Sequence, residues 1–368
     1  MKFFTDYLTY IVKLLDRYQN YISEKNRPEI SVTPIILEKF NKLRNRFVIL
    51  QSIEGLTEPD QIQRNIASFR TLLMELEILE SFGLPIITHY QKEFDGHLTS
   101  ILNRICEEVG CPVNTPHVCA LSTGIASRGS DYYWYHPSFE TIFVPAAERF
   151  SLLNLPDVLH ELGHHILMTY RDSFLEPFSK WFSECNSQLE RELFIQGVGD
   201  QNRIRESKEI FSTRWPSFWA EEIICDMIAA YCTGEAFAWT NLKLCQSYPP
   251  DRPDALFSYS ETHPPDAYRM DAILTMLKQI RIDDIEIQNT WAVYITIAGP
   301  GKPALYDIYF PMVLINKMTK HVCNICGDIG LISCTKNNSR NDSIIAKLNQ
   351  AWLMFRKDMD SLFEMEGF

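Results

Sequence analysis

Two histidines and a glutamate lie within five residues of one another in the stretch NLPDVLHELGHHIL, residues 154–167. His160, Glu161 and His164 form an H-E-x-x-H pattern. Residues four apart lie on one face of an α-helix, one turn above the other, so both imidazoles can bind a single metal ion. The glutamate then lies beside the ion, where it can act as a general base. The pattern favours a metal centre; the alternative is an amphipathic helix with solvated or core histidines.

The residues around this pattern predict a helix. Pro156 suits the first helical position, and Asp157 is favourable near the positive end of the helix dipole. The apolar residues of the same segment supply a face to bury: Val158, Leu159, Leu162 and Ile166. His165 lies about 100° around the helix from His164, so we expect it to pack in the core or beside the site rather than bind the same ion.

A catalytic zinc ion commonly takes three protein ligands and one water molecule, whose pKa it lowers toward neutrality. A histidine six residues after His164 is one familiar third ligand, but Tyr170 occupies that position. A glutamate from a second helix is the other option. The segment WAEEIICDMIAAY, residues 219–231, places Glu222 and Asp226 four apart on one helical face. Glu222 can reach the metal while Asp226 accepts the N–H of a ligating histidine.

Other acidic residues remain possible ligands at this stage. An acidic pair on a helix is often only a solvated face, although the apolar residues around this pair indicate a buried helix whose carboxylates need partners. Glu221 competes with Glu222 but lacks an aspartate four residues later. A preceding segment adds three further acidic residues: Glu184, Glu190 and Glu192.

Three segments in chain order resemble the gluzincin metallopeptidases. They are HELGH, EEIICD with its E-x-x-x-D, and THPPDAYRM (residues 262–270) with H-P-x-x-x-x-R. Within the gluzincins they look most like the group that contains the HtpX heat-shock protease and the CaaX prenyl proteases. The resemblance covers Tyr132 to Arg269, and the membrane spans of that group are missing here.

The resemblance implies a role for each matching residue. It implies zinc ligands at His160, His164 and Glu222, a general base at Glu161, and an orienting carboxylate at Asp226. It further implies that His263 lies near the site, where it can hydrogen-bond an oxyanion, while Arg269 holds the loop through an ion pair.

The resemblance also implies that Glu140–Pro145 forms an exposed edge strand to which an extended substrate adds by main-chain hydrogen bonds. A core strand is the alternative interpretation of that segment.

The elements that must position these residues predict an α+β fold: a zincin-like catalytic core, made of a small sheet and the two ligand helices, within a predominantly helical chain. Apolar residues at helical spacing predict a helical lobe over residues 1–110. Short aromatic or β-branched runs at 131–135 and 140–145 predict two strands within a core that extends over 111–285. Residues 286–368 are expected to be strand-like and loop-like at first and then mostly helical, with a final helix at 344–363.

The composition narrows the classes of binding partner that we expect. The chain has 368 residues, 46% of them hydrophobic, and a formal net charge of −12, with no cluster of basic residues to follow a phosphate backbone, so we expect no nucleic-acid partner. No apolar window is long enough to span a membrane, and ten scattered cysteines indicate reduced thiols in a cytoplasmic protein. The oligomeric state is left open. Cys323 and Cys326 have the C-x-x-C spacing of a zinc knuckle, but the preceding residues predict a helix that continues through both.

These expectations combine into one hypothesis: a zinc-dependent endopeptidase that hydrolyses protein or peptide substrates, with Glu161 as general base. Two alternatives stay open. One is a non-catalytic zincin-fold protein with a regulatory or interaction role. The other is a narrow regulator protease that cleaves a single cellular partner.

Overall fold

The structure of the chain is a computed structural model. It describes the following residues: 2–25, 33–51, 59–80, 94–121, 133–136, 141–145, 151–195, 209–245, 255–298, 302–337 and 342–365.

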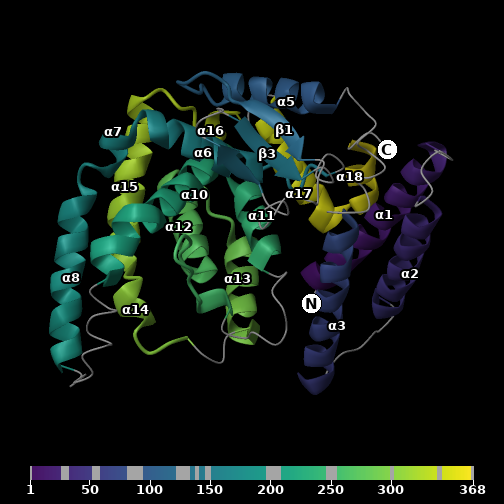
Figure 1. Cartoon of the computed structure of the whole chain (residues 1–368), viewed down its shortest axis with the longest axis horizontal. Coiled ribbons are helices and arrows are strands. Elements are labelled where there is room, and N and C mark those ends of the chain that lie inside the picture. The colour runs from purple at the N-terminus through teal and green to yellow at the C-terminus, as the bar shows by residue number, and fades with distance from the viewer. Residues whose placement is uncertain are drawn as a thin grey trace.

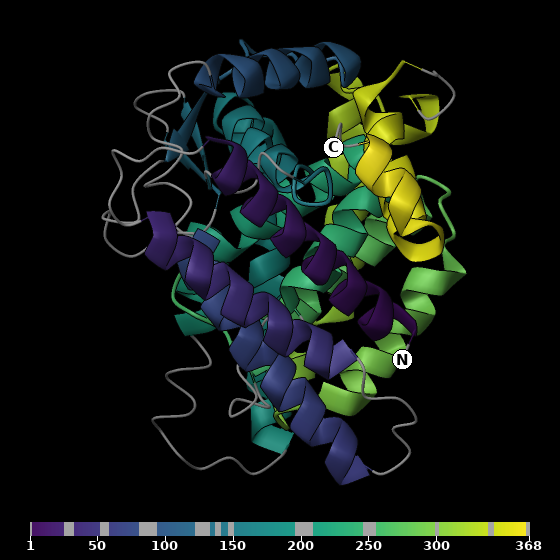
Figure 2. The ribbon, with the colours of Figure 1, turned by 90° about the vertical axis from the view of Figure 1, so that its right-hand side faces the viewer.

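Three long helices at the N-terminus form one side of the molecule (Figure 1). They are α1 (Lys2–Lys25), α2 (Thr33–Gln51) and α3 (Pro59–Ile78). α2 contacts both of the others, and Figure 2 shows α1 and α2 side by side with α3 behind them. Apolar residues at helical spacing, such as Leu15 and Phe47, are fully buried between the helices. The predicted helices in this region are confirmed.

A small sheet lies beside helix α5 (Phe94–Glu108) at the top of Figure 1. Its strands are β1 (His117–Leu121), β2 (Trp134–His136) and β3 (Thr141–Pro145). β3 is in the middle, parallel to β1 and antiparallel to β2. Ile142 and Val144 of β3 are buried, and because they lie two residues apart they share one face of the sheet.

Helix α10 (Ala220–Thr233) is the centre of the fold. Every residue from Ile223 to Thr233 is buried in it. The helices that cross or flank it are α6 (Asp157–Thr169), α11 (Glu235–Cys245), α12 (Asp266–Gln279), α15 (Met312–Asp328) and α17 (Ile344–Lys357). An apolar helix inside a ring of helices needs no amphipathic face, because all of its sides are covered.

The remaining elements cover this central layer. They are α7 (Arg171–Leu175), α8 (Phe178–Ile195), the π-helix η4 (Ile210–Trp219), the 3₁₀ turn η5 (Ala255–Phe257), α13 (Ile285–Ala298), α14 (Tyr306–Tyr309), α16 (Cys334–Asn337) and α18 (Met359–Met365). The strand-like interpretation of residues after 285 is wrong. α13 contains several β-branched residues, but Ile287 and Trp291 lie four apart and pack one face of a helix into the core.

The predicted fold class is also wrong: the chain is all-α rather than α+β. The strands have only five, three and five residues, whereas helices supply the rest of the regular structure that is described. The misleading signal was the aromatic and β-branched composition of residues 131–145, which predicts local strands but does not show how large a sheet they belong to. The predicted division at residues 110 and 285 stays a prediction. Within the described ranges, no helix has the length and apolar character that crossing a membrane requires.

Candidate metal centre

A close crossing of α6 and α10 creates the site. Gly163, inside the H-E-x-x-H pattern, lies against Cys225 of α10, and a Cβ atom added at Gly163 would be 3.0 Å from the Cα of Cys225. Nearly all real Cβ contacts are longer than that, so the two helix backbones approach closely only because this residue has no side chain. The approach places the histidines of α6 directly opposite the acidic residues of α10.

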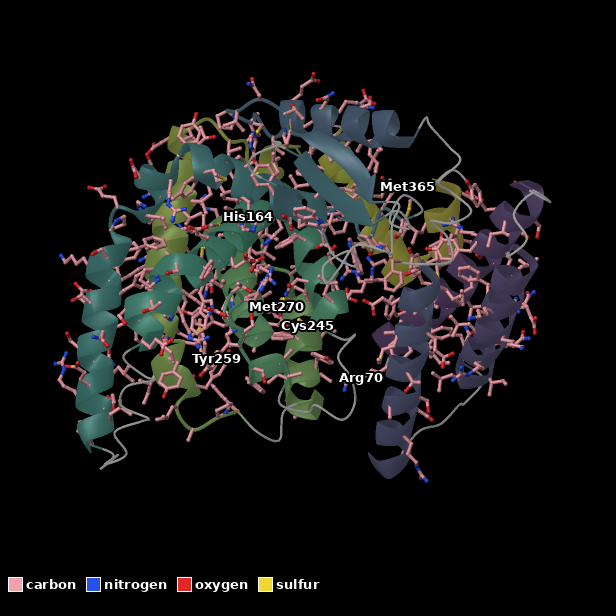
Figure 3. All side chains as sticks on the ribbon, viewed as in Figure 1. Arg70, His164, Cys245, Tyr259, Met270 and Met365 are labelled. Atoms are coloured by element: carbon pink, nitrogen blue, oxygen red, sulfur yellow. The ribbon has the colours of Figure 1, made fainter. Side chains whose placement is uncertain are left out.

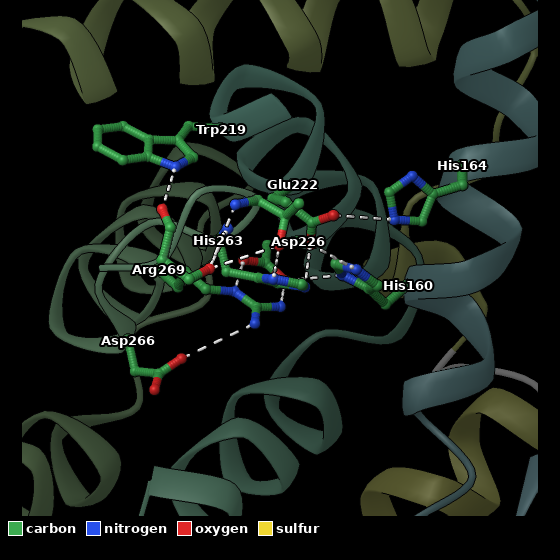
Figure 4. Close-up of polar contacts among 10 residues, drawn as sticks. His160, His164, Trp219, Glu222, Asp226, His263, Asp266 and Arg269 are labelled. Carbon is green, nitrogen blue, oxygen red and sulfur yellow. Dashed lines mark hydrogen bonds and ion pairs between the residues drawn. The ribbon is translucent and has the colours of Figure 1, made fainter. Parts of the chain in front are cut away.

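Three predicted ligands converge at this crossing (Figure 4). The Nε2 atom of His160 is 3.3 Å from Oε2 of Glu222, and the Nε2 atom of His164 is 3.5 Å from Oε1. The ligand atoms of the three residues all lie within 4.8 Å of one another. Figure 3 shows that His164 lies in the interior of the helical body, far from the N-terminal helices. Two imidazoles and a carboxylate in this arrangement could hold a metal ion.

The donor set fits a zinc ion. Nitrogen and oxygen ligands bind zinc at about 2.0–2.2 Å, so two ligands in a tetrahedral arrangement lie about 3.3–3.6 Å apart. The two nitrogen-to-oxygen distances, 3.3 Å from His160 and 3.5 Å from His164, match that spacing. With three protein ligands, a tetrahedral ion keeps one position for water or substrate.

A buried ion pair fixes the orientation of His160. Its Nδ1 atom is 2.8 Å from Oδ1 of Asp226, which is completely buried. Arg269 of α12 donates two hydrogen bonds to the same carboxylate, at 2.7 and 2.8 Å. Asp226 accepts the Nδ1–H of His160, so the Nε2 atom is the one that faces Glu222 and would give up its proton to bind a metal ion. The expected orienting role of Asp226 therefore has the required geometry.

The pKa values of the centre follow from the same contacts. Burial disfavours the charged imidazolium of His160, but the hydrogen bond and charge of Asp226 outweigh it and raise the pKa of His160 to about 10. Burial acts to raise the pKa of Glu222, yet the two histidines and Arg269 hold it below its ordinary value. Burial lowers the pKa of His164 to about 4, so this imidazole is neutral. The carboxylates of Glu222 and Asp226 remain ionised, and their negative charge favours binding of a cation.

Glu161 lies beside the three ligands and not among them. It is 7% exposed, and burial raises its pKa to about 7. The main chain of Tyr135 in β2 hydrogen-bonds its carboxylate. A carboxyl group with a pKa near neutrality can both take and return a proton, which suits a general base.

The segment before α12 brings a third histidine to the site. The Nε2 atom of His263 is 3.8 Å from Oε2 of Glu222, and its side chain is 56% exposed. Ser260 holds the turn, because its Oγ accepts the N–H of His263 at 2.8 Å and its carbonyl accepts the indole N–H of Trp219 at 3.2 Å. His263 is thus at the open side of the centre, as the resemblance implied.

The strand nearest the centre differs from the expected one. β3 is paired on both sides, so Thr141–Pro145 is not an exposed edge, and Glu140 lies outside the described residues. The edge that contacts α6 is β2. The sequence could not show this, because strand order depends on which segments meet in space.

His165 has a structural role that the sequence only suggested. Its Nδ1 atom accepts the hydroxyl of Tyr135 at 2.7 Å, and its Nε2 atom donates to the carbonyl of Asn114 at 2.8 Å. Both ring nitrogens are therefore used, and His165 is 6% exposed. This imidazole fastens β2, and the residues that precede β1, to the helix that carries the metal ligands.

The competing ligands lie elsewhere. Glu221 pairs with Arg171 at 2.5 Å, which leaves Glu222 as the glutamate that faces the histidines. Glu184 pairs with Lys317 on the surface, and neither Glu190 nor Glu192 joins the site. Cys323 and Cys326 lie inside the continuous helix α15. Among the described residues, His160, His164 and Glu222 form the one group with metal-binding geometry.

Arg269 lies in α12 and forms an ion pair, as the resemblance implied. Its main partner is the buried Asp226 of α10 rather than a residue of the loop before α12. A signal was present in the sequence, since a buried Asp226 requires a cationic partner and Arg269 is the one basic residue of the T-H-P-P-D-A-Y-R-M segment.

Fold and site together define a helical protein with a buried histidine–histidine–glutamate centre at the crossing of two helices. No protein-family model matches the chain, and comparisons with curated proteins and with solved structures also find no match. The resemblance to gluzincins consequently depends on the motif residues and their geometry.

Proposed function

We propose that this protein is a zinc-dependent peptidase of the gluzincin type, with His160, His164 and Glu222 as the zinc ligands. The observation that carries the proposal is the convergence of these three side chains, whose ligand atoms lie within 4.8 Å of one another, with Glu161 beside them. A structural zinc site usually has four protein ligands, whereas a catalytic site keeps one position open. Three ligands plus an adjacent carboxylate favour catalysis.

A zinc ion held by His160, His164 and Glu222 would polarise a peptide carbonyl and lower the pKa of a water molecule at the open position. Glu161, whose pKa is raised to about 7, takes a proton from the attacking water and returns it to the departing amine. His263, with its ring near Glu222 on the exposed side, donates a hydrogen bond to the oxyanion of the tetrahedral intermediate. Asp226 and Arg269 keep His160 in the orientation that ligation requires.

The strand β2 supports a peptide as the substrate. It is the edge strand nearest α6, and an extended chain can add to such an edge through main-chain hydrogen bonds. Main-chain recognition selects for extended backbone more than for particular side chains, so unfolded or flexible protein segments are the substrate class that we infer.

The test compares the native protein with Glu161→Gln, which keeps the size of the side chain and removes the base. Zinc content is measured by elemental analysis of protein purified without a metal-affinity tag, and cleavage is measured on a fluorescent unfolded casein and on the proteins of a cell extract. The proposal expects about one zinc per chain in both proteins and cleavage by the native protein alone.

Two other results would each favour a different function. Zinc in both proteins without cleavage of any substrate would indicate a non-catalytic protein that uses the centre for structure or sensing. Cleavage of one extract protein, with casein intact, would indicate a narrow regulator protease. Absence of zinc from the native protein would contradict the proposed function itself.

A further inference from the structure

A pair of cysteines closes the C-terminal end of α5. The N–H of Cys111 donates to the carbonyl of Cys106 at 2.8 Å, and the N–H of Gly110 donates to Glu107 at 3.3 Å. Gly110 has a φ of 63°, in the left-handed region that favours glycine. These features define a Schellman motif, in which the third-last residue of the helix and the third residue beyond its end bring their side chains together. Here both of those positions hold cysteine.

The motif places the two residues within disulfide range. With the N–H···O bond at 2.8 Å, standard bond geometry limits the separation of the two Cα atoms to about 6.7 Å. Disulfides join Cα atoms about 4.4–6.8 Å apart. The side chains also point toward each other, because the Cys106 thiol is hydrogen-bonded to the sulfur of Cys111.

The two thiols have different environments. Cys106 is 4% exposed, whereas Cys111 is partly exposed to solvent. The hydrogen bond from Cys106 lowers the pKa of Cys111, and the same interaction raises the pKa of Cys106. Cys111 is therefore the more accessible and the more acidic thiol of the two, and Cys106 is its protonated neighbour.

We propose that Cys106 and Cys111 are a redox-active thiol pair that hydrogen peroxide converts into a reversible disulfide. The Cys111 thiolate attacks the terminal peroxide oxygen, the O–O bond breaks, and water leaves after protonation, so Cys111 becomes a sulfenic acid. The Cys106 sulfur then attacks the Cys111 sulfur, and hydroxide leaves with the thiol proton as a second water. Two thiols are oxidised and one peroxide is reduced to two waters.

The pair lies at a joint between distant parts of the chain. The carbonyl of Val109 accepts the N–H of Ile332 at 2.8 Å. The carboxylate of Glu108 caps α17, accepting the N–H of Ile344 and the hydroxyl of Ser343, each at 2.8 Å. A disulfide between Cys106 and Cys111 would fix the turn at the end of α5 while the hydrogen bonds of Val109 and Glu108 stay in place.

The test treats the reduced full-length protein with hydrogen peroxide, blocks remaining thiols with N-ethylmaleimide, and digests it with trypsin and Glu-C. Cleavage after Glu107 separates Cys106 from Cys111, so a disulfide appears as two linked fragments whose mass is lower by two hydrogen atoms. We expect this link to form, to be reversed by dithiothreitol, and to be absent from Cys111→Ser. Cys185, a partly exposed thiol whose pKa burial raises to about 11, is the internal control and should oxidise at least about tenfold more slowly.

A second variant keeps the proposal testable if one substitution disturbs the fold. Cys106→Ala should leave Cys111 as a sulfenic acid that dimedone labels. Three results would overturn the proposal. Cys111 could stay reduced after Cys185 has oxidised, or it could form a disulfide with the buried Cys232 or with Cys119. Fragmentation of the linked peptides distinguishes a Cys111–Cys119 disulfide from a Cys106–Cys111 disulfide. None of these measurements depends on zinc or on peptidase activity.

Discussion

Arg269 binds both carboxylate oxygens of Asp226, and Asp226 in turn binds the metal-facing His160. The three side chains come from α12, α10 and α6, so one chain of hydrogen bonds joins the three helices around the centre. Asp226 is completely buried, and its charge is acceptable there only because Arg269 neutralises it. The candidate centre is thus held by an ion pair that is not itself part of the group formed by His160, His164 and Glu222.

Asp226→Asn should destabilise the protein and weaken the site together. The change keeps the side-chain size but leaves the buried Arg269 without its counter-charge, so we expect a loss of about 3–5 kcal/mol in the free energy of unfolding. We also expect zinc affinity to fall about 10–100-fold, because His160 loses its orienting acceptor. Urea denaturation and a zinc competition assay measure the two effects. The double variant Asp226→Asn, Arg269→Met should lose less unfolding free energy than the sum of the losses in the two single variants. A loss equal to that sum would contradict an energetic coupling between Asp226 and Arg269.

Gly163→Ala should separate the two ligand helices. The new methyl group would lie 3.0 Å from the Cα of Cys225, where only backbone movement can relieve the contact. We expect a loss of about 1–3 kcal/mol in stability, although alanine by itself favours a helix. Gly327→Ala in α15 is the matched control, because nothing lies within 4 Å of its added Cβ. That control should be neutral or more stable by up to about 1 kcal/mol in thermal or urea unfolding.

Two adjacent histidines should respond oppositely to the same substitution. His164→Gln removes a ligand, so zinc should be lost from the purified protein. His165→Gln removes the contacts to Tyr135 and Asn114 and should retain zinc, with a stability loss of about 1–3 kcal/mol from unsatisfied buried groups. Elemental analysis and thermal unfolding of both variants distinguish the roles. Equal zinc loss in the two variants would show that His165 is needed for the centre itself.

Glu80 should make stability depend on pH. Burial raises its pKa to about 7, and the hydroxyl of Tyr18 donates to its carboxylate at 2.8 Å. Its folded pKa exceeds its unfolded pKa, so its stabilising contribution is fully present below about pH 4.5 and is lost as the pH rises through about 7. The loss is at most about 3 kcal/mol.

The measurement for Glu80 is urea unfolding between pH 5 and pH 8. Glu80→Gln cannot ionise, so its stability relative to the native protein should increase with pH over this range. Glu176→Gln, an exposed glutamate that follows α7, is the control and should parallel the native protein. Parallel curves for all three proteins would rule out the role of Glu80.

Local patterns predicted much of this protein. The i, i+4 spacing of His160 and His164, and of Glu222 and Asp226, defines a helical face by backbone geometry alone, which is why the sequence identified these side chains before the structure placed them. The N-terminal helices, α5 and the course of α15 through Cys323 and Cys326 followed from apolar periodicity in the same way.

Relations between segments far apart in the chain required the tertiary structure. Only the crossing at Gly163 and Cys225 selects Glu222 over Glu221, whose carboxylate pairs with Arg171. Only packing brings Arg269 to Asp226 and places β2, rather than β3, at the edge beside the metal centre. The sequence by itself determined which residues share a helical face, because a helical face depends only on neighbours a few positions away. Which helical faces meet depends on burial and charge neutralisation over the whole chain, so only the tertiary structure decided it.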